Sequence, residues 1–333
     1  MKVAVIGAGS WGSALAQVLA SNNHNVCMQA RKQSVVDGIN TQHKNPRYLC
    51  DVVLSKNITA TTSLELACKQ ACAIVVVVPS SILRTTANAL AGIVDGNTPF
   101  IICSKGVEGK TGLLPTQIFE SCLGNAGRLA VLSGPNHAEE VVRAMYAGTV
   151  IASTDNNTAL FFRDLFATAN FRAYTSSDVA GVEICAAFKN VIAIAVGIAA
   201  GLKLGDNAQA LLMTRGLAEM SRLVVKCGGQ ALTCMGLAGT GDLIATCTSP
   251  HSRNRTFGEE LAAGGTLDAY CKRTHMVVEG ANACKTLQVL ASKHDVELPI
   301  TNVVRDVVWG GANVESAINQ LINRPLKQEF YGV

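Results

Sequence analysis

The chain begins MKVAVIGAGSWGSALAQVLA (residues 1–20), and this stretch decides the fold. A short apolar, β-rich run precedes the glycines Gly7, Gly9 and Gly12, and an Ala/Leu-rich run with helical spacing follows them over 13–20. The G-x-G-x-x-G spacing therefore lies where a strand passes into a helix. In that setting the glycines allow a tight turn, a close approach of backbone to pyrophosphate, and close packing of the helix on the strand. A purely structural turn would share the spacing, but its position directly after the first strand favours a dinucleotide site.

Further apolar runs predict a sheet with helices between its strands. The run 74–78 is apolar on both faces, as expected of a strand covered on each side by helices. We therefore expect an α/β fold with an N-terminal doubly wound, mostly parallel sheet of Rossmann type. The predicted strands are 2–6, 25–31, 57–63, 73–80, 99–106, 128–135, 148–154 and 171–176.

The composition of the sequence changes near residue 178. Beyond it Ala, Gly, Leu and Met dominate, β-rich runs nearly vanish, and helical periodicity persists to the end. The length of 333 residues also favours two domains over one. We predict a dinucleotide-binding Rossmann domain over 1–178 and an all-α substrate-binding domain over 179–333, with the helix that begins after Asp178 as the joint.

Composition and charge exclude several classes of protein. With 49% hydrophobic and 16% charged residues, the chain is globular rather than disordered. The net charge of +4 comes from dispersed basic residues, so no nucleic-acid partner is expected, although a basic pocket for a phosphorylated small molecule remains possible. The partner expected is a small-molecule substrate.

Cysteines and apolar segments indicate the compartment. The 12 cysteines contain no C-x-x-C pair and are interpreted as reduced thiols. Since the first residues already form a strand, no signal peptide is expected, and we predict a cytoplasmic protein without membrane insertion. The apolar stretch 191–202 is interpreted as too short for a membrane helix and as a buried one.

The end of the second predicted strand bears on the choice of cofactor. An acidic residue there commonly binds the ribose hydroxyls of NAD, but this chain has Gln29, Ala30, Arg31 and Lys32. Arg31 and Lys32 would favour the 2′-phosphate of NADP, with Arg31 able to make bidentate contacts. Two alternatives stay open: these two cations could simply be solvated after the strand, or the protein could accept both NAD and NADP.

Two strand ends carry candidate substrate contacts. Lys105 follows the fifth predicted strand, at the sheet edge where open α/β sheets bind ligands, although a plain loop lysine would occupy the same place. Gly134 and Asn136 follow the sixth strand, where backbone and amide donors could hold a substrate. An ordinary turn would look much the same.

Lys189 is the principal candidate for proton transfer. It is the only charge between Glu183 and Lys203, on a helix that should be mostly buried. Burial of an ammonium lowers its pKa toward values useful for acid–base chemistry. The alternative is a lysine whose ammonium reaches solvent from the helix edge.

The stretch 235–258 combines a glycine-rich turn, Asp242, and the run Ser252, Arg253 and Asn254. A guanidinium with neutral hydrogen-bonding neighbours suits phosphate, and a solvated loop is the alternative. The six histidines show no metal-ligand spacing, so no metal site is expected. The absence of G-x-S-x-G gives hydrolase chemistry no support.

Together these motifs resemble the bacterial NAD(P)-dependent glycerol-3-phosphate dehydrogenases, in matching order over essentially the whole chain. The blocks that carry the resemblance are GAGSWGSALA, SKG, LSGPNHAEE, AAFKNVIAIAVGIAAGL, GLAGTGDLIATCTSPHSRN and VVEG. The resemblance implies hydride exchange between NADP(H) and/or NAD(H) and C2 of glycerol 3-phosphate or dihydroxyacetone phosphate, supplying phospholipid synthesis. It also implies a cytoplasmic homodimer whose fold is similar to that of 6-phosphogluconate dehydrogenase.

The resemblance also assigns roles to matching positions. Lys189 would transfer the proton, and Lys32 and Tyr48 are further cofactor candidates. The family commonly has Ser or Thr followed by Phe where this chain has Asn136 and His137, and an amide could still donate to substrate oxygen. The implied cofactor contacts are Gly7, Gly9, Ser10, Trp11, Gly12, Arg31, Lys105, Ala138, Arg253, Val277 and Glu279. The implied substrate contacts are Lys105, Gly134, Asn136, Lys189, Asp242, Ser252, Arg253 and Asn254.

Two other functions fit part of the pattern. A 3-hydroxyacid or ketopantoate-type reductase would share the glycine loop and a lysine in the helical domain, but would not need the Ser252–Asn254 phosphate contact. A regulatory protein that senses NADP(H) without turnover would not need Lys105, Lys189 and Asp242 together. Oxidation of reduced cofactor by dihydroxyacetone phosphate discriminates all three.

Overall fold

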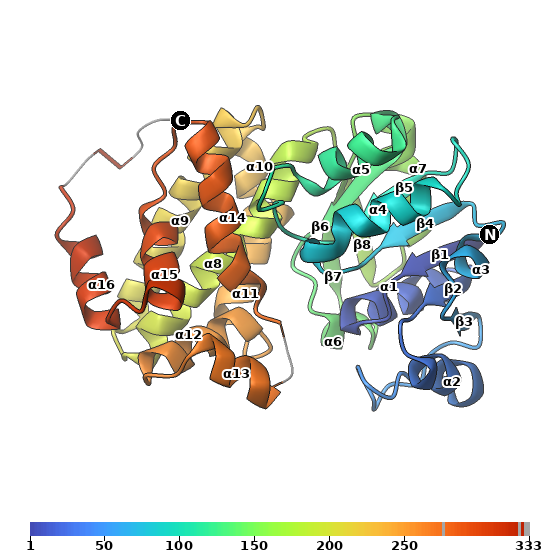
Figure 1. Cartoon of the computed structure of the whole chain (residues 1–333), viewed down its shortest axis with the longest axis horizontal. Coiled ribbons are helices and arrows are strands. Elements are labelled where there is room, and N and C mark those ends of the chain that lie inside the picture. The colour runs from blue at the N-terminus through green and yellow to red at the C-terminus, as the bar shows by residue number, and fades with distance from the viewer. Residues whose placement is uncertain (275–276, 326–327, 330–333) are drawn as a thin grey trace. The chain divides into compact units, whose positions relative to one another are not determined.

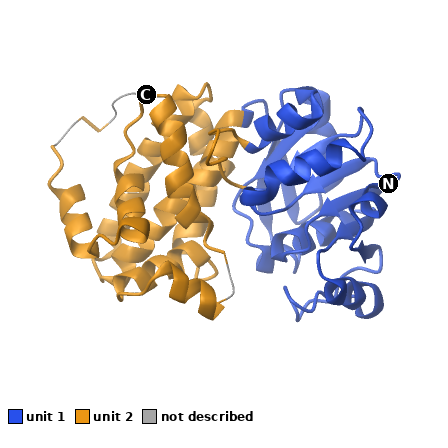
Figure 2. Cartoon of the chain, viewed as in Figure 1, with its two compact units in different colours: residues 1–104, 115–179 blue, residues 105–114, 180–333 orange. Residues whose placement is uncertain are grey.

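The computed structural model describes residues 1–274, 277–325 and 328–329. They form two compact units, which Figure 2 shows in different colours. Unit 1 comprises Met1–Ser104 and Pro115–Val179, and unit 2 comprises Lys105–Leu114 and Ala180–Val333.

Unit 1 is built on one mostly parallel sheet, which confirms the predicted fold class (Figure 1). In the described part of the chain the strand order is β3-β2-β1-β4-β5-β6-β7-β8, with β7 antiparallel to β6 and every other neighbouring pair parallel. The predicted strands are confirmed, although most end earlier than expected. The strands are β1 (Lys2–Ile6), β2 (Asn25–Gln29), β3 (Ile58–Thr61), β4 (Ala73–Val76), β5 (Phe100–Ile102), β6 (Leu129–Ser133), β7 (Ala147–Ala152) and β8 (Phe171–Ser176).

The strand order of this sheet reverses at β1. Strand β1 pairs with β2 on one side and with β4 on the other, so successive connections run in opposite directions from β1. Since parallel crossovers are right-handed, their helices cover opposite faces, and the carboxyl ends of β1 and β4 form the switch point at which open α/β sheets bind ligands. The helices of unit 1 are α1 (Ser10–Ser21), α2 (Gln33–Gln42), α3 (Leu64–Cys68), α4 (Leu83–Ala91), α5 (Pro115–Leu123), α6 (Ala138–Val141) and α7 (Asn156–Phe166).

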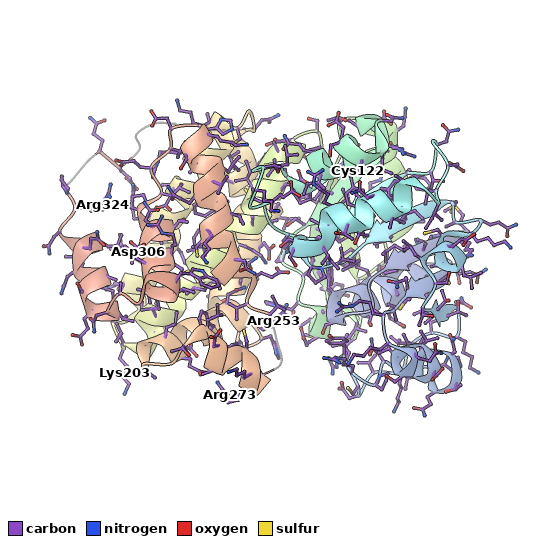
Figure 3. The ribbon with its side chains drawn as sticks, viewed as in Figure 1. Cys122, Lys203, Arg253, Arg273, Asp306 and Arg324 are labelled. Atoms are coloured by element: carbon purple, nitrogen blue, oxygen red, sulfur yellow. The ribbon has the colours of Figure 1, made fainter. Side chains whose placement is uncertain are left out.

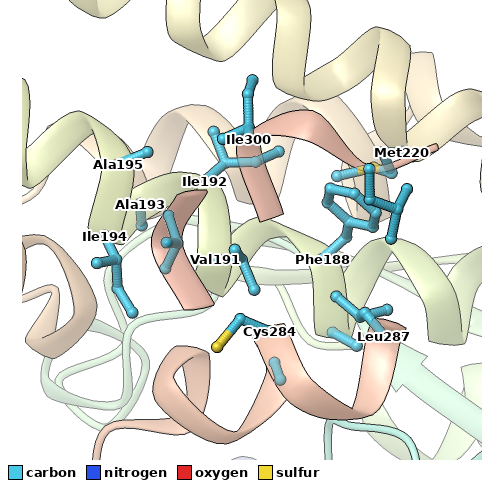
Figure 4. Close-up of a cluster of buried hydrophobic side chains, with 14 of the residues drawn as sticks. Phe188, Val191, Ile192, Ala193, Ile194, Ala195, Met220, Cys284, Leu287 and Ile300 are labelled. Atoms are coloured by element: carbon cyan, nitrogen blue, oxygen red, sulfur yellow. The ribbon is translucent and has the colours of Figure 1, made fainter. Parts of the chain in front are cut away.

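Unit 2 is helical and is organised around α8 (Val179–Gly201). Every residue of α8 from 181 to 199 is buried, and Figure 4 shows Phe188 and Ile192 within the apolar cluster that surrounds it. The other helices of unit 2 are α9 (Asp206–Lys226), α10 (Ala231–Met235), α11 (Asp242–Thr248), α12 (Arg253–Ala262), α13 (Leu267–Thr274), α14 (Glu279–Lys293), α15 (Pro299–Gly310) and α16 (Val314–Ile322).

Helix α8 corrects one expectation and confirms another. Its 23 residues, with a mean hydropathy of 1.9 over the most apolar window, are long and apolar enough to cross a membrane. The interpretation of 191–202 as too short was therefore wrong, because the helix begins 12 residues earlier, at Val179. The prediction of burial is confirmed, since 89% of that window is buried inside the protein. Helix α8 is therefore the buried central helix of unit 2.

The segment Lys105–Leu114 departs from the expected division at residue 178. It begins three residues after the end of β5 in unit 1 but packs as part of unit 2. Val107 and Leu114 are buried in the core around α8, and the Lys293 ammonium donates to the Thr111 carbonyl. Lys105, at the start of this segment, therefore belongs to the helical unit.

Helices α8 and α12 approach so closely that only glycine fits at their contact. A Cβ at Gly258 would lie 2.2 Å from the Ile194 carbonyl oxygen, and one at Gly197 would lie 2.1 Å from the Arg255 carbonyl oxygen. A backbone atom cannot move aside as the end of a side chain can. The path of α12 is thus set by this pair of glycines.

We predict that Gly258→Ala lowers the free energy of unfolding by about 2 kcal/mol or more, because the added methyl group forces α8 and α12 apart. Denaturant unfolding of the purified protein measures the change. The matched control is Gly310→Ala in α15, where the nearest atom is 3.9 Å away and the change should be neutral or slightly stabilising. Equal stability of the two variants would contradict the close contact.

Candidate active site

The glycine loop of unit 1 has the geometry of an anion cradle. Gly7 has φ +115°, and a Cβ there would lie 2.3 Å from the Val77 carbonyl oxygen. A Cβ at Gly12 would lie 2.0 Å from the Gly7 carbonyl oxygen, whereas nothing lies within 4 Å of one at Gly9. Helix α1, which begins with Ser10, has neither a side-chain cap nor an acidic residue in its first turn. Its unpaired N–H groups and positive dipole end therefore suit a pyrophosphate.

The neighbouring residues also fit a dinucleotide. Arg31 and Lys32 follow β2 in exposed positions and make no ion pair in the part of the chain that the structure describes. Trp11 Nε1 is buried without a hydrogen-bond partner among the described residues, which leaves a donor for a ligand. Tyr48 is exposed, with the Arg47 guanidinium 5.7 Å from its ring centre. The residues present in unit 1 are thus compatible with NAD(P).

In the turn after β6, the side chain of Asn136 makes hydrogen bonds within the protein that the sequence did not predict. Asn136 Nδ2 donates to the carbonyl oxygens of Pro135 (3.0 Å) and Gly148 (2.9 Å), and its Oδ1 is buried without a partner in the described chain. Both hydrogens of this amide are used in this geometry, so donation to substrate would require one of these bonds to break, and that contact stays a prediction. A Cβ at Gly134 would lie 2.7 Å from the same Gly148 carbonyl oxygen, so glycine is required there. Any substrate contact of Gly134 or cofactor contact of Ala138 stays a prediction.

Unit 2 brings Lys105, Lys189 and Asp242 together. One carboxylate oxygen of Asp242 lies 2.8 Å from Lys105 Nζ, and the other accepts a hydrogen bond from Lys189 Nζ. Only 3% of the Asp242 side chain and 9% of the Lys189 side chain are exposed. Two cations thus share one buried anion, and the group of three carries a net positive charge. The sequence predicted each residue separately, and the structure joins them.

Three local features place these side chains. Lys189 projects from the buried helix α8, and Lys105 begins the segment that packs into unit 2. Asp242 begins α11, which continues directly from η3 (Leu237–Gly241). The expected glycine-rich turn is therefore a π-helical segment, a form often found at functional sites. A Cβ at Gly239 would lie 2.1 Å from the Cys234 carbonyl oxygen, so this packing requires glycine.

Burial and charge set the protonation of the group. Burial lowers the pKa of Lys189 to about 8, with the nearby Lys105 charge acting in the same direction and Asp242 opposing both. Burial alone would also lower the pKa of Lys105, but the charges of Asp242 and Glu279 outweigh it and raise that pKa. Burial would raise the pKa of Asp242, and the two lysines instead hold it below its usual value. Lys189 is thus the group able to gain and lose a proton near neutral pH.

Sequence reasoning missed one partner of this group, Thr246, and a hydrogen bond beside it, at Asn190. Thr246 accepts a hydrogen bond from Lys189 Nζ at 2.8 Å and donates to the Asp242 carbonyl oxygen at 2.6 Å. Its position four residues after Asp242 on one helix was the available signal. Asn190, next to Lys189, accepts a hydrogen bond from Asn254 Nδ2 at 2.9 Å.

The predicted phosphate-binding run begins α12. Ser252 caps the helix by accepting a hydrogen bond from the Arg255 N–H, and Asn254 accepts one from the Gly280 N–H at 2.9 Å. These two side chains are buried, whereas Arg253 lies at the surface (Figure 3). Its guanidinium is 3.5 Å from the Val277 carbonyl oxygen. Of the predicted run, Arg253 is the residue exposed to a ligand.

A cradle for pyrophosphate and a buried lysine poised for proton transfer make this chain a nicotinamide-dependent dehydrogenase by class. Models of the NAD-dependent glycerol-3-phosphate dehydrogenase N-terminus and C-terminus match residues 2–159 and 178–319. A glycerol-3-phosphate dehydrogenase [NAD(P)+] from Corynebacterium urealyticum is 44% identical over 99% of this chain and 100% of its own length. The chain belongs to the NAD-dependent glycerol-3-phosphate dehydrogenase family and is an NAD(P)-dependent oxidoreductase.

Solved structures agree with this assignment. The crystal structure of glycerol-3-phosphate dehydrogenase from Coxiella burnetii has a TM-score of 0.93 and 35% identity, covering 97% of this chain and 99% of that one. A ketopantoate reductase from Ralstonia eutropha has a TM-score of 0.62 at 16% identity, over 96% of this chain and 100% of that one. At that identity the reductase shares the fold alone.

We predict that Asp242→Asn lowers the free energy of unfolding by about 3 kcal/mol or more at pH 6, because it leaves two buried ammonium groups without their anion. In the variant the folded-state pKa values of these lysines fall below the unfolded value. The folded state is therefore favoured as pH rises, and the loss should shrink toward pH 10. Unfolding at both pH values measures this.

The matched control is the change of Asp306, labelled in Figure 3, to Asn. It removes an exposed ion pair with Arg305 and should cost less than about 1 kcal/mol. An Asp242→Asn variant as stable as this control at pH 6, or one whose loss is the same at pH 10, would contradict the shared-anion account.

Proposed function

We propose that the chain interconverts dihydroxyacetone phosphate and sn-glycerol 3-phosphate by hydride transfer with NADP(H) or NAD(H). The observation that carries the proposal is the pair of lysines that share Asp242, with the pKa of Lys189 lowered to about 8. Such a lysine can be acid in one direction and base in the other near neutral pH. Family membership supplies the substrate class.

The cofactor contacts proposed in unit 1 are the glycine loop with Ser10 and Trp11, and Arg31 for a 2′-phosphate. When bound, NAD(P)H supplies the hydride. Arg31 is exposed and has no acidic neighbour at the end of β2, which supports acceptance of NADP as well as NAD. From unit 2, Lys105, Arg253, Val277 and Glu279 are proposed to contribute further contacts, with Ala138 from unit 1.

Lys189 is proposed to act on the C2 oxygen of the substrate. As C2 of the ketone is reduced, negative charge grows on its oxygen, and a buried ammonium stabilises that charge more than it would in water. Lys189 then donates a proton from Nζ to this oxygen. In the opposite direction its neutral amine accepts the hydroxyl proton.

Asp242 and Lys105 prepare Lys189 for this role. Each carboxylate oxygen of Asp242 accepts a hydrogen bond from one of the two ammonium groups, which fixes their positions without neutralising the group. The second cation, Lys105, lowers the pKa of Lys189 and leaves net positive charge for the substrate oxygen. Thr246 directs the Lys189 ammonium through a further hydrogen bond.

Arg253 is proposed to bind the substrate phosphate, with Ser252 and Asn254 beside it. Asn254 still has one amide hydrogen unused by its bond to Asn190, so it can both hold the helices together and donate to a ligand. Phosphate binding remote from C2 would orient the reacting carbon.

We further propose a cytoplasmic homodimer that supplies glycerol 3-phosphate for phospholipid synthesis. The exposed Leu204, two residues before α9, and Leu211, within α9, offer apolar side chains for a contact between copies. Sedimentation of the purified protein tests the oligomeric state.

We predict that Lys189→Ala leaves dinucleotide affinity intact but lowers kcat for dihydroxyacetone phosphate at least ~10²-fold, because general acid–base catalysis contributes that order of magnitude. Steady-state oxidation of NADPH and NADH measures kcat. The control is Lys226→Ala at the exposed end of α9, which should keep wild-type kcat. Near-wild-type turnover of the Lys189 variant would remove it from the mechanism.

We also predict that Arg253→Lys lowers kcat/KM for dihydroxyacetone phosphate by roughly two factors of ten, since a point ammonium cannot reproduce a planar two-donor contact with phosphate. Unphosphorylated dihydroxyacetone should be affected far less, and NADPH affinity is measured alongside to separate any cofactor effect. The control is Arg273→Lys, at the residue labelled in Figure 3, which makes an ion pair with Glu260. An equal loss for both ketones would reject the phosphate contact.

A further inference from the structure

Asn45 is a buried polar side chain in unit 1 that none of the roles above uses. It lies in the loop between α2 and β3, and only 1% of it is exposed. Its Nδ2 donates to the Ala8 carbonyl oxygen at 3.0 Å and to Ser13 Oγ at 2.9 Å. Ala8 lies inside the glycine loop, and Ser13 is in the first turns of α1. The side chain thus reaches across 37 residues of sequence to the anion cradle.

The contact with Ala8 fixes the orientation of one peptide group in the cradle. In a planar trans peptide the carbonyl and the following N–H point in opposite directions. When Asn45 holds the Ala8 carbonyl, the Gly9 N–H is therefore directed to the other side of the loop. Ser13 receives the second amide hydrogen while its own N–H donates to the Gly9 carbonyl oxygen at 2.9 Å. The two peptide groups that flank Gly9 are thus linked, directly or through Ser13, to Asn45.

The other end of the Asn45 side chain orders the cofactor-side segment that follows it. Its Oδ1 accepts hydrogen bonds from the N–H groups of Arg47 and Tyr48, each at 3.1 Å. This is the pattern by which Asn fixes a turn through its own following backbone. Both amide hydrogens and both lone pairs of Asn45 are therefore used. One side chain connects the glycine loop to the segment that carries Tyr48.

We propose that Asn45 is a positioning residue for dinucleotide binding, which it serves by holding the Ala8–Gly9 peptide group and the 46–48 turn in one fixed arrangement. The inference rests on the proposed function, because it requires that the glycine loop binds NAD(P)(H). Asn45 itself need not touch the ligand. Its effect is to orient the donors of the loop before binding, which removes an ordering cost from association.

Asn40, in α2, provides a matched control. Its Nδ2 donates to the Ala60 carbonyl oxygen at 2.9 Å, and its Oδ1 accepts from the Ala60 N–H at 2.7 Å. Asn40 therefore connects α2 to β3 by the same kind of side-chain bonds, without contact to the glycine loop. A merely structural role for Asn45 would give Asn45→Ala and Asn40→Ala the same consequences.

The experiment compares Asn45→Ala, Asn45→Ser and Asn40→Ala with the wild type. It measures the Kd of NADPH and NADH by the fluorescence of the reduced nicotinamide, the Tm of the ligand-free protein, and KM and kcat with dihydroxyacetone phosphate. A serine at 45 can still accept from the N–H groups of the turn, but it is too short to reach Ala8. This variant keeps the turn and removes the link to the cradle.

We expect both Asn45 variants to raise the Kd of NADPH and NADH about tenfold, the order expected when buried hydrogen bonds that hold a site are lost. At saturating cofactor, kcat and the KM for dihydroxyacetone phosphate should stay near wild type. Asn40→Ala should lower Tm without changing either Kd. This split between cofactor affinity and the other quantities is the signature of positioning.

Three outcomes would overturn the inference. Wild-type Kd values in Asn45→Ala would show that the cradle needs no such support. Equal loss of affinity in Asn45→Ala and Asn40→Ala would show a general effect of instability. Wild-type affinity in Asn45→Ser would assign the effect to the turn and remove the link to Ala8. A wild-type protein that binds neither dinucleotide would instead overturn the proposed function, and this inference with it.

Discussion

The carboxylate of Asp242, shared by two lysines, is the interaction on which the proposed chemistry of this protein depends. Two ammonium groups in a buried site would repel one another and resist desolvation, and one anion between them makes the arrangement tolerable while leaving a net positive charge. Burial and the Lys105 charge, opposed by Asp242, give Lys189 a pKa of about 8, below its ordinary value. In the proposed mechanism the same three side chains therefore bear on both stability and reactivity.

Close approaches of backbone support this arrangement. Glycine is required at Gly197 and Gly258, where α8 meets α12, and at Gly239, where η3 passes the Cys234 carbonyl. These contacts fix the helices from which Lys189 and Asp242 project. In unit 1, close backbone contacts at Gly7 and Gly12 likewise fix the path of the glycine loop. Each unit thus uses tight packing of main chain to place a small number of polar groups.

Sequence patterns predicted the parts of the structure that depend on local periodicity and composition. The glycine loop, the strands and the burial of Lys189 follow from alternation, apolar runs and an isolated charge. The packing of Lys105–Leu114 with unit 2 could not be predicted in this way, because it depends on where Val107 and Leu114 find a core. The acceptors of the Asn136 amide hydrogens could not be predicted either. One of them, the Gly148 carbonyl oxygen, comes from a neighbouring strand. Non-local contacts decide which candidate side chains remain available.

The pH dependence of kcat/KM in the two directions tests the central claim most directly. In the proposed mechanism Lys189 must be an ammonium to reduce dihydroxyacetone phosphate. The value of kcat/KM for the ketone should therefore be constant below an apparent pKa of about 8 and should fall tenfold per pH unit above it. For oxidation of glycerol 3-phosphate the neutral amine is needed, and kcat/KM should rise through the same pKa. Profiles that stay flat from about pH 6.5 to 9.5 in both directions, or that fall together, would contradict a Lys189 whose pKa is set by burial beside Asp242 and Lys105.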